Sequence, residues 1–265
     1  MREAVAKLIR EAAQQFILPR FRSKDDLSIQ EKTPGDIVTI VDLEVEAFLR
    51  EGLGQLLPLP FVGEESWGED ARELLRKGSC WLVDPLDGTR SFVEGDERFA
   101  VIVARIDDGQ CEEGWLYFPA TDELYYAKRG EGAHSSQGVS RVANPTNTGR
   151  YRLNWVASDQ RNELQRRLQL AGWSTDTPTC WEFRRILLGE PGGYLCSHVT
   201  PWDMVAGVLL VVEAGGTVIR SDRSTPTPSD EQGLYVFAPD DDSAENWIAT
   251  FELSSIQTSS PIDGV

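Results

Sequence analysis

A chain of 265 residues, 40% of them hydrophobic, is long enough to bury a large core as one domain or as two smaller ones. Its 43 acidic and 26 basic side chains give a net charge of -17, which disfavours binding to nucleic acid and to anionic membranes and draws divalent cations toward any acidic cleft. Its four cysteines are dispersed without a Cys-x-x-Cys pair, which argues against a zinc ribbon, a redox motif or a disulfide framework and indicates a reducing cytoplasm.

The chain opens on a segment with helical periodicity. Apolar side chains recur on one helical face from Val5 to Ile17, and Pro19 ends the pattern, so this segment is predicted to be an amphipathic helix packed on a core. Glu3 and Glu11 interrupt any long apolar run. Neither a signal peptide nor a membrane span is therefore expected here.

The next elements bring acidic residues to their ends. A short strand at 36–39 leads into a second helix with Asp42 in its first turn, where the plain interpretation is a helix cap. An apolar strand, Phe61–Gly63, then runs into Glu64 and Glu65. Adjacent side chains of an extended chain point in opposite directions, so only one of these two glutamates can face a site.

The stretch from Trp81 to Phe92 is the centre of the prediction. Its apolar run predicts a buried strand that delivers Asp84 and Asp87 at its end, and Gly88 and Thr89 follow in a turn. Carboxylates beside the backbone N–H groups of such a turn could hold Mg²⁺ on one side and a phosphate on the other. Taken alone, an Asp-x-x-Asp-Gly run is more often a turn whose aspartates accept from backbone donors.

A meander is predicted next, with antiparallel strands at Ala100–Ile106, Glu113–Phe118 and Glu123–Ala127. A glycine-rich polar stretch follows at 128–138, and the turn-rich run at 144–149 is the best candidate boundary between two halves. Residues 1–145 are predicted to form an N-terminal α+β half with most of the candidate metal ligands. Residues 146–265 are predicted to form a C-terminal α/β half with Asp203 and the substrate-side residues.

The second half alternates α and β elements. The pattern predicts a strand near 151–156, helices at 159–170 and 181–188, a helix with Thr200 as cap and Asp203 in its first turn, strands at 217–219 and 234–237, and a last helix capped by Ser243. Asp203 could simply complement the helix dipole. It nevertheless shares with the other candidate acids a place at the end of an element, from which side chains converge on clefts in α/β folds.

Other hydrolytic chemistries fail on spacing. Asp84 and Asp87 are one residue too far apart for an aspartyl-phosphatase nucleophile motif, and Cys180 lacks a correctly spaced arginine for a cysteine phosphatase. No Gly-x-Ser-x-Gly elbow and no Gly-x-x-x-x-Gly-Lys run occurs. The two histidines, His134 and His198, lie in polar stretches and are interpreted as surface residues.

Three motifs closely resemble the signatures of the inositol monophosphatase superfamily: Gly63–Ser66, Asp84–Thr89 and Trp202–Gly216. The likeness reaches residues 36–42 and covers most of the chain. It implies an α/β (α+β) protein with a layered α-β-α-β-α sugar-phosphatase fold, a large antiparallel N-terminal sheet and a smaller mixed C-terminal sheet. It also implies Mg²⁺-dependent hydrolysis of a small phosphorylated metabolite by a metal-activated water, in a cytoplasmic, lithium-sensitive homodimer.

The resemblance also implies a ligand set for the metal ions. In the family's pattern, Glu64, Asp84 and the backbone carbonyl of Leu86 would hold a first Mg²⁺. Asp84, Asp87 and Asp203 would hold a second, so that Asp84 would bridge the two ions. Two cations about 4 Å apart can neutralise charge on both the attacking and the leaving oxygen of a phosphate ester.

Further roles follow from the same resemblance. Thr89, together with Glu64, would orient and activate the attacking water. Asp42 would support that end of the site or a weaker third ion. Asp87, Gly88 and Thr89 would contact the substrate, the last two through backbone donors aimed at its phosphate.

The substrate itself stays open. Inositol-specific members carry a sugar-reading glutamate where an ungapped count back from Trp202 places Cys196, and a thiol is a poor substitute. Histidinol phosphate, suggested by residues 87–92, and 3′-phosphoadenosine 5′-phosphate are alternatives within the superfamily. A non-catalytic binding or regulatory protein on this scaffold is the alternative from another class. Three arginines are interpreted as solvated surface residues that could otherwise meet a second anionic group: Arg90, Arg184 and Arg185.

Overall fold

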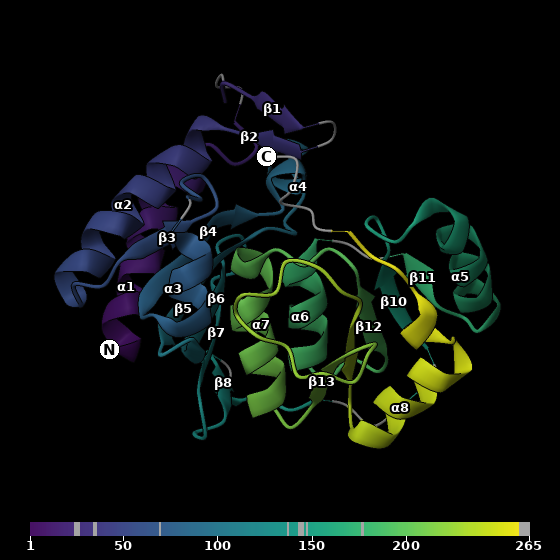
Figure 1. Ribbon diagram of the computed structural model, residues 1–265. Helices are drawn as coiled ribbons and strands as arrows, with labels where there is room; N and C mark the ends of the chain where they lie inside the picture. Colours follow the sequence, from purple (N-terminus) through teal and green to yellow (C-terminus); the bar gives the residue numbers. More distant parts are fainter. Residues whose placement is uncertain are drawn as a thin grey trace.

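The structure, a computed structural model, describes residues 1–23, 27–33, 36–68, 70–136, 138–142, 146, 148–175 and 178–259. Within these residues, two β-sheets alternate with three layers of helices (Figure 1). The layered α-β-α-β-α arrangement expected from the sequence is confirmed.

Seven strands form the larger sheet, in the order β3-β4-β5-β6-β7-β8-β9. Their bounds are β3 Phe61–Gly63, β4 Cys80–Asp87, β5 Ala100–Asp107, β6 Gln110–Phe118, β7 Glu123–Lys128, β8 Ala133–Ser135 and β9 Gly138–Val139. The predicted meander is antiparallel, but β3 pairs parallel with β4, so the sheet is mixed. The reason is helix α3 (Ala71–Lys77), which lies between β3 and β4 in the chain and provides the crossover that parallel strands require.

Five strands form the smaller sheet, in the order β11-β10-β12-β14-β13. Their bounds are β10 Gly149–Arg152, β11 Ser174–Thr175, β12 Gly193–Cys196, β13 Thr217–Arg220 and β14 Tyr235–Ala238. Parallel pairs on one side of β12 and antiparallel pairs on the other confirm the predicted mixed sheet. The sequence did not indicate β12, because glycine is rare in a central strand. A Cβ on Gly193 would lie 2.2 Å from the Trp247 ring, so that close approach requires it.

The helices take up the other three layers. The bounds of the α-helices besides α3 are α1 Arg2–Ala12, α2 Ile40–Leu56, α4 Thr89–Val93, α5 Ser158–Leu170, α6 Thr179–Leu187, α7 Pro201–Glu213 and α8 Asp241–Thr250. A π-helical turn at Ala13–Ile17 follows α1, and a 3₁₀ turn at Leu253–Ser255 follows α8. Two further strands, β1 Gln30–Thr33 and β2 Asp36–Val38, form a small hairpin. Helices α1 and α2 cover one face of the larger sheet, α6 and α7 lie between the sheets, and α5 and α8 cover the far face of the smaller sheet.

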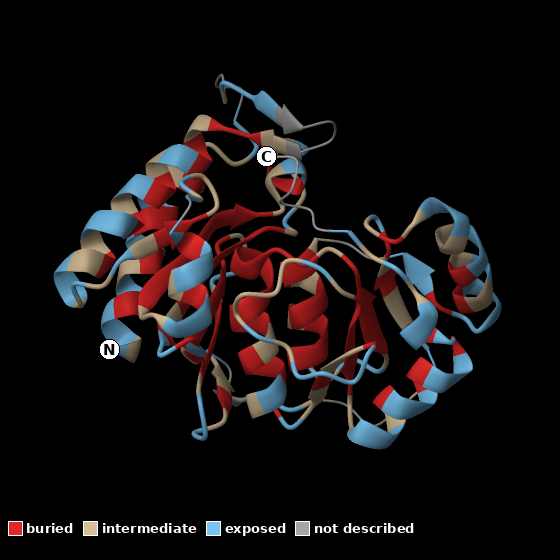
Figure 2. Ribbon diagram, viewed as in Figure 1, coloured by how far each residue is buried: buried red, intermediate tan, exposed pale blue. Residues whose placement is uncertain are grey.

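Strand alternation divides the core into two clusters around the larger sheet. Trp81 and Val83 of β4 pack with α1 and α2, whereas Leu82 of β4 and Ile102 of β5 pack with α6 and α7. Figure 2 shows these strands and the middle helices buried, while the outer helices expose one side. Because β4 is covered on both faces, its first four residues, from Cys80 to Val83, are an unbroken apolar run rather than an alternation.

Helix α7 lies close to its neighbours because its packing faces carry small side chains. A Cβ on Gly114 of β6 would lie 3.2 Å from Ala206, and one on Gly207 would lie 2.0 Å from the Phe183 ring of α6. This packing fixes α7, and with it Asp203, relative to the larger sheet.

Two details correct or limit the sequence prediction. The last helix is capped by Asp240, whose Oδ1 accepts the backbone N–H of Ser243 at 2.8 Å, whereas Ser243 itself was expected to be the cap. The domain boundary between 1–145 and 146–265 stays a prediction, because residues 143–145 and 147 lie outside the described part.

Among the described residues, no helix has the length and apolar character to cross a membrane.

Candidate metal centre

The end of β4 is shaped so that Asp84 and Asp87 both turn into the space between the layers. The register with β5 shifts between these two residues, and the Leu86 N–H donates to Asp84 Oδ1 at 2.9 Å. Gly88 follows with a φ of +89° and is the N-cap of helix α4. The bulge explains how two aspartates three residues apart can serve one site.

Three carboxylates converge at this point. One oxygen each of Asp84, Asp87 and Asp203 can be chosen so that all lie within 4.8 Å of one another, and all three residues are buried. Strand β4 supplies the first two and the first turn of α7 supplies the third. Anionic oxygen donors are what Mg²⁺ prefers in proteins, so the donor set fits that ion.

The electrostatics of the cluster also favour a bound cation. Burial, with the charges of Glu64, Asp203 and Asp87, raises the pKa of Asp84 well above its usual range. Burial and the charge of Asp203 raise the pKa of Asp87 to about 6. Burial opposes ionisation of Asp203 too, but the interaction of its carboxylate with the His198 side chain favours ionisation, and its pKa is lowered. A bound cation would relieve this repulsion, since it favours ionised carboxylates.

Asp42 is both the cap that the sequence suggested and a neighbour of the cluster. Its Oδ2 accepts the Thr39 N–H at 2.8 Å in a capping box at the start of α2. Its Oδ1 lies 3.0 Å from Thr89 Oγ1, which also lies 2.9 Å from the Leu86 carbonyl oxygen. Burial, opposed by the Thr39 hydrogen bonds, raises the pKa of Asp42. One carboxylate therefore both caps α2 and contacts Thr89 beside the cluster.

Glu64 lies just beyond β3, and its N–H donates to the Val83 carbonyl oxygen at 3.1 Å, beside β4. It is half-buried and is not one of the three residues whose oxygens meet within 4.8 Å, although its charge acts on Asp84. Buried Glu46 of α2, which the sequence analysis passed over, accepts the Glu65 N–H at 2.9 Å and thereby fixes the turn that carries Glu64. The sign of this role in the sequence is that the glutamate stands beside core positions of a helix.

The N-terminus of α6 also meets the cluster. The Cys180 N–H donates to Asp87 Oδ2 at 2.6 Å, and the Arg152 charge acts to lower the pKa of Asp87. Arg152 Nη1 in turn donates to Thr179 Oγ1 at 3.0 Å. The arginine spacing after Cys180 excluded a nucleophile there, and no pattern in the sequence indicates the contact that its backbone N–H makes.

His198 is not the surface residue that the sequence analysis expected. Its Nε2 lies 3.4 Å from Asp203 Oδ2, and its Nδ1 accepts the Trp155 indole N–H at 2.8 Å. Neither partner could be found from the polar sequence around the histidine. His134 is partly exposed in β8, as expected.

Two of the three arginines proposed as solvated are paired within the protein. Arg184 donates to Glu123 through Nε at 2.8 Å and through Nη2 at 2.7 Å, and buried Arg185 donates to Glu182 at 2.6 Å. The surface interpretation is wrong for both, because each guanidinium is paired with a carboxylate of the chain. Arg90 is exposed, as expected.

Cys196 ends β12 and is fully buried. Its Sγ lies 3.2 Å from the His198 carbonyl oxygen, so the thiol contacts the backbone of the chain. A side chain with no solvent exposure does not read substrate hydroxyls as an exposed glutamate could.

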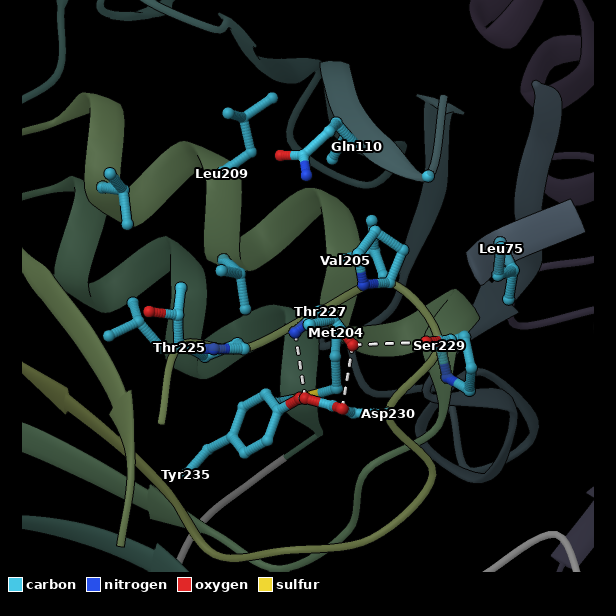
Figure 3. Close-up of a pocket in the computed structure, with 18 of the residues that line it drawn as sticks. Leu75, Gln110, Met204, Val205, Leu209, Thr225, Thr227, Ser229, Asp230 and Tyr235 are labelled. Atoms are coloured by element: carbon cyan, nitrogen blue, oxygen red, sulfur yellow. Dashed lines mark hydrogen bonds between the residues drawn. The ribbon is translucent and has the colours of Figure 1, made fainter. Parts of the chain in front are cut away.

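A separate cavity of about 470 Å³ lies along α7 (Figure 3). Its floor includes Val205 and Leu209, and the 225–230 loop borders it, held by Asp230 through hydrogen bonds from Thr227 and Tyr235. None of the three clustered aspartates lines it. This cavity is therefore distinct from the candidate metal centre.

Five layers and a buried carboxylate cluster between them define a class, the layered sugar-phosphatase fold. The chain belongs to the inositol monophosphatase family: the model of the Inositol monophosphatase family matches residues 1–254. Inositol-1-monophosphatase of Bacillus subtilis (strain 168) is 30% identical over 227 residues, covering 81% of this chain and 83% of that protein. Nus factor SuhB of Pasteurella multocida (strain Pm70) is 31% identical over 217 residues, covering 78% and 80%.

Solved structures agree with the fold. Inositol monophosphatase-II from Staphylococcus aureus MSSA476 superposes with a TM-score of 0.77 at 22% identity, over 96% of this chain and 92% of that one. The extragenic suppressor protein suhB from Bartonella henselae gives 0.76 at 24% identity, over 95% and 96%. At this level of identity the likeness concerns the fold.

The turn at Gly88 allows a stability prediction. A Cβ there would lie 2.5 Å from the Arg98 carbonyl oxygen, on a backbone with positive φ. We expect Gly88→Ala to lower the free energy of unfolding by about 2–4 kcal/mol, measured by urea denaturation. Gly130→Ala is the matched control, because its φ is +75° and a Cβ there meets no atom within 4 Å. Its loss should be only about 1 kcal/mol, and equal losses for both variants would contradict the close contact.

Proposed function

We propose that this protein is a Mg²⁺-dependent phosphatase of small phosphate monoesters. The observation that carries the proposal is the meeting of Asp84 and Asp87 from β4 with Asp203 from α7 in one buried cluster. Such a cluster is costly to keep ionised without a cation, and family membership gives the same chemistry. When bound, Mg²⁺ would supply the positive charge that stabilises a phosphate ester under attack and would acidify water.

The ligand roles are part of the proposal. Glu64, Asp84 and the Leu86 carbonyl would hold one ion, and Asp84, Asp87 and Asp203 another. In support, Glu64 lies near enough to Asp84 for its charge to raise the pKa of that carboxyl. The backbone N–H groups of Gly88 and Thr89 would receive the substrate phosphate.

Thr89 and Asp42 would handle the proton of the attacking water. A threonine hydroxyl has one proton, and the acceptors near Thr89 Oγ1 are Asp42 Oδ1 and the Leu86 carbonyl oxygen. With that proton committed, Oγ1 still has lone pairs that can accept a hydrogen bond. A water donating to Thr89 would thus be oriented and would have a path for its proton toward Asp42.

We expect Thr89→Val to lower kcat by about 10²- to 10³-fold, because the hydroxyl that orients the water is lost while the shape is kept. Thr89→Ser is the matched control and should retain most of the rate. Both variants should bind Mg²⁺ like the unmodified protein by titration calorimetry. A Thr89→Val enzyme with unchanged kcat would rule out the proton path.

A second candidate is a regulatory protein on the same scaffold. The observation in its favour is that one relative, 31% identical, is named a Nus factor. Phosphate release with and without Mg²⁺ separates the two candidates. The panel of substrates is inositol 1-phosphate, histidinol phosphate, 3′-phosphoadenosine 5′-phosphate, fructose 1,6-bisphosphate and 2′AMP. The last is included because SaIMPase-II has been solved with it bound, as well as with inositol monophosphate.

The proposed phosphatase should release phosphate from at least one of these esters only when Mg²⁺ is present, and kcat/KM should rank them. Buried Cys196 leads us to expect that inositol 1-phosphate is not the best substrate. No Mg²⁺-dependent release from any ester would favour the regulatory scaffold.

A further inference from the structure

Hydrogen bonds join the segment between β12 and α7 to the segment after β10. The Ser197 N–H donates to the Arg152 carbonyl oxygen at 2.8 Å, and the Trp155 N–H donates to Ser197 Oγ at 3.2 Å. These contacts place His198 beside Trp155, with ring centroids 6.3 Å apart. The imidazole is thus held in place before any ligand arrives.

The hydrogen bond from Trp155 defines which nitrogen of His198 carries the proton. An indole N–H can only donate, so His198 Nδ1, at 2.8 Å from Trp155 Nε1, must be an unprotonated acceptor. In the neutral ring the proton then sits on Nε2, which lies 3.4 Å from Asp203 Oδ2. His198 therefore donates toward one particular oxygen of Asp203.

We infer that His198 is a positioning residue for Asp203, with its tautomer set by Trp155. A donor at Nε2 that faces Asp203 Oδ2 restrains the carboxylate through that oxygen, at the place where Asp203 meets Asp84 and Asp87. Partners of this kind, one step removed from a metal, orient the ligating group and restrict its rotation. This inference rests on the proposed function, because it takes Asp203 as a cation ligand.

The test measures Mg²⁺ binding by titration calorimetry without substrate, together with the ¹⁵N spectrum of the imidazole rings. We expect His198→Ala to weaken binding of Mg²⁺ by about 10- to 100-fold. His198→Gln should recover most of the affinity, because its amide can donate to Asp203. Trp155→Phe should give an intermediate loss, because the donor remains but its tautomer is no longer set.

His134→Ala is the matched control, since the chain has two histidines and His134 lies in β8, away from the cluster. It should bind Mg²⁺ like the unmodified protein, and it leaves one imidazole to assign. That ring should show a proton on Nε2 and none on Nδ1. This spectrum needs no change at His198, so the test survives if His198→Ala fails to fold.

The outcomes separate this inference from the proposed function. If the unmodified protein binds no Mg²⁺, the metal centre is wrong and the inference fails with it. If the unmodified protein and His198→Ala bind Mg²⁺ equally, the positioning role alone is wrong. A proton on Nδ1 of His198 would likewise overturn it.

Discussion

We expect Asp84→Asn to lower the rate of Mg²⁺-dependent phosphate release by about 10³-fold or more, equivalent to about 4 kcal/mol of transition-state stabilisation. Asp84 is the fully buried acid that the proposed ligand set shares between both ions. An amide has the same shape, and its oxygen can keep the hydrogen bond from the Leu86 N–H. The loss should therefore reflect charge rather than a change of fold.

The same substitution should stabilise the metal-free protein, because it removes a charge that burial and its acidic neighbours oppose. Asp108→Asn is the matched control, an exposed aspartate in the turn between β5 and β6, and should change neither rate nor stability. The measurements are initial rates at saturating Mg²⁺ and thermal unfolding in EDTA. Turnover near that of the unmodified enzyme would rule out the assignment of Asp84.

The strands and helices that carry the clustered acids could be predicted because each has a local signal. The apolar run before Asp84 is buried on both faces, which only a central strand allows. The Thr200-Pro201 start set the boundary of α7 and put Asp203 in its first turn, although the Thr200 side chain makes no cap hydrogen bond. That these ends meet followed from general α/β architecture and from the family resemblance.

What the sequence could not give are contacts made by folding distant segments together. His198 lies in a polar stretch, and only the pairing of β12 with β10 brings Trp155 beside it. The same holds for the Cys180 backbone N–H on Asp87, 93 residues away. Buried arginines such as Arg185 look like surface residues until their partners are seen, because a paired charge can be buried and a single one is not.

A second large effect is expected in how pH and Mg²⁺ change the stability of the protein. The pKa of Asp87 is about 6 in the folded chain, against about 3.9 in an unfolded one, so folding favours its protonated form. Its stabilising contribution, about 3 kcal/mol at most, is complete below pH 4 and is lost as the pH rises toward 6. Asp84 extends this loss of folding stability to higher pH, because its pKa is raised well above its usual range.

Asp203 acts in the opposite sense. Its pKa is lowered, so its contribution is lost only as the pH falls below about 4, outside that window. In EDTA, we therefore expect the melting temperature to fall between pH 4.5 and pH 7.5 more steeply for the unmodified protein than for Asp87→Asn. Asp108→Asn should follow the unmodified protein.

Mg²⁺ should reverse the loss at neutral pH. At 100 times its Kd, a cation bound only to the folded chain adds about 2.7 kcal/mol, which raises the melting temperature of a protein of this size by roughly 5–10 °C. The gain should shrink at pH 5, because protons then compete for the same carboxylates. Asp87→Asn should lose most of it at every pH. If Mg²⁺ raised the melting temperature of Asp87→Asn as much as that of the unmodified protein, the ion would bind elsewhere. Protons alone would then relieve the repulsion between the clustered carboxylates.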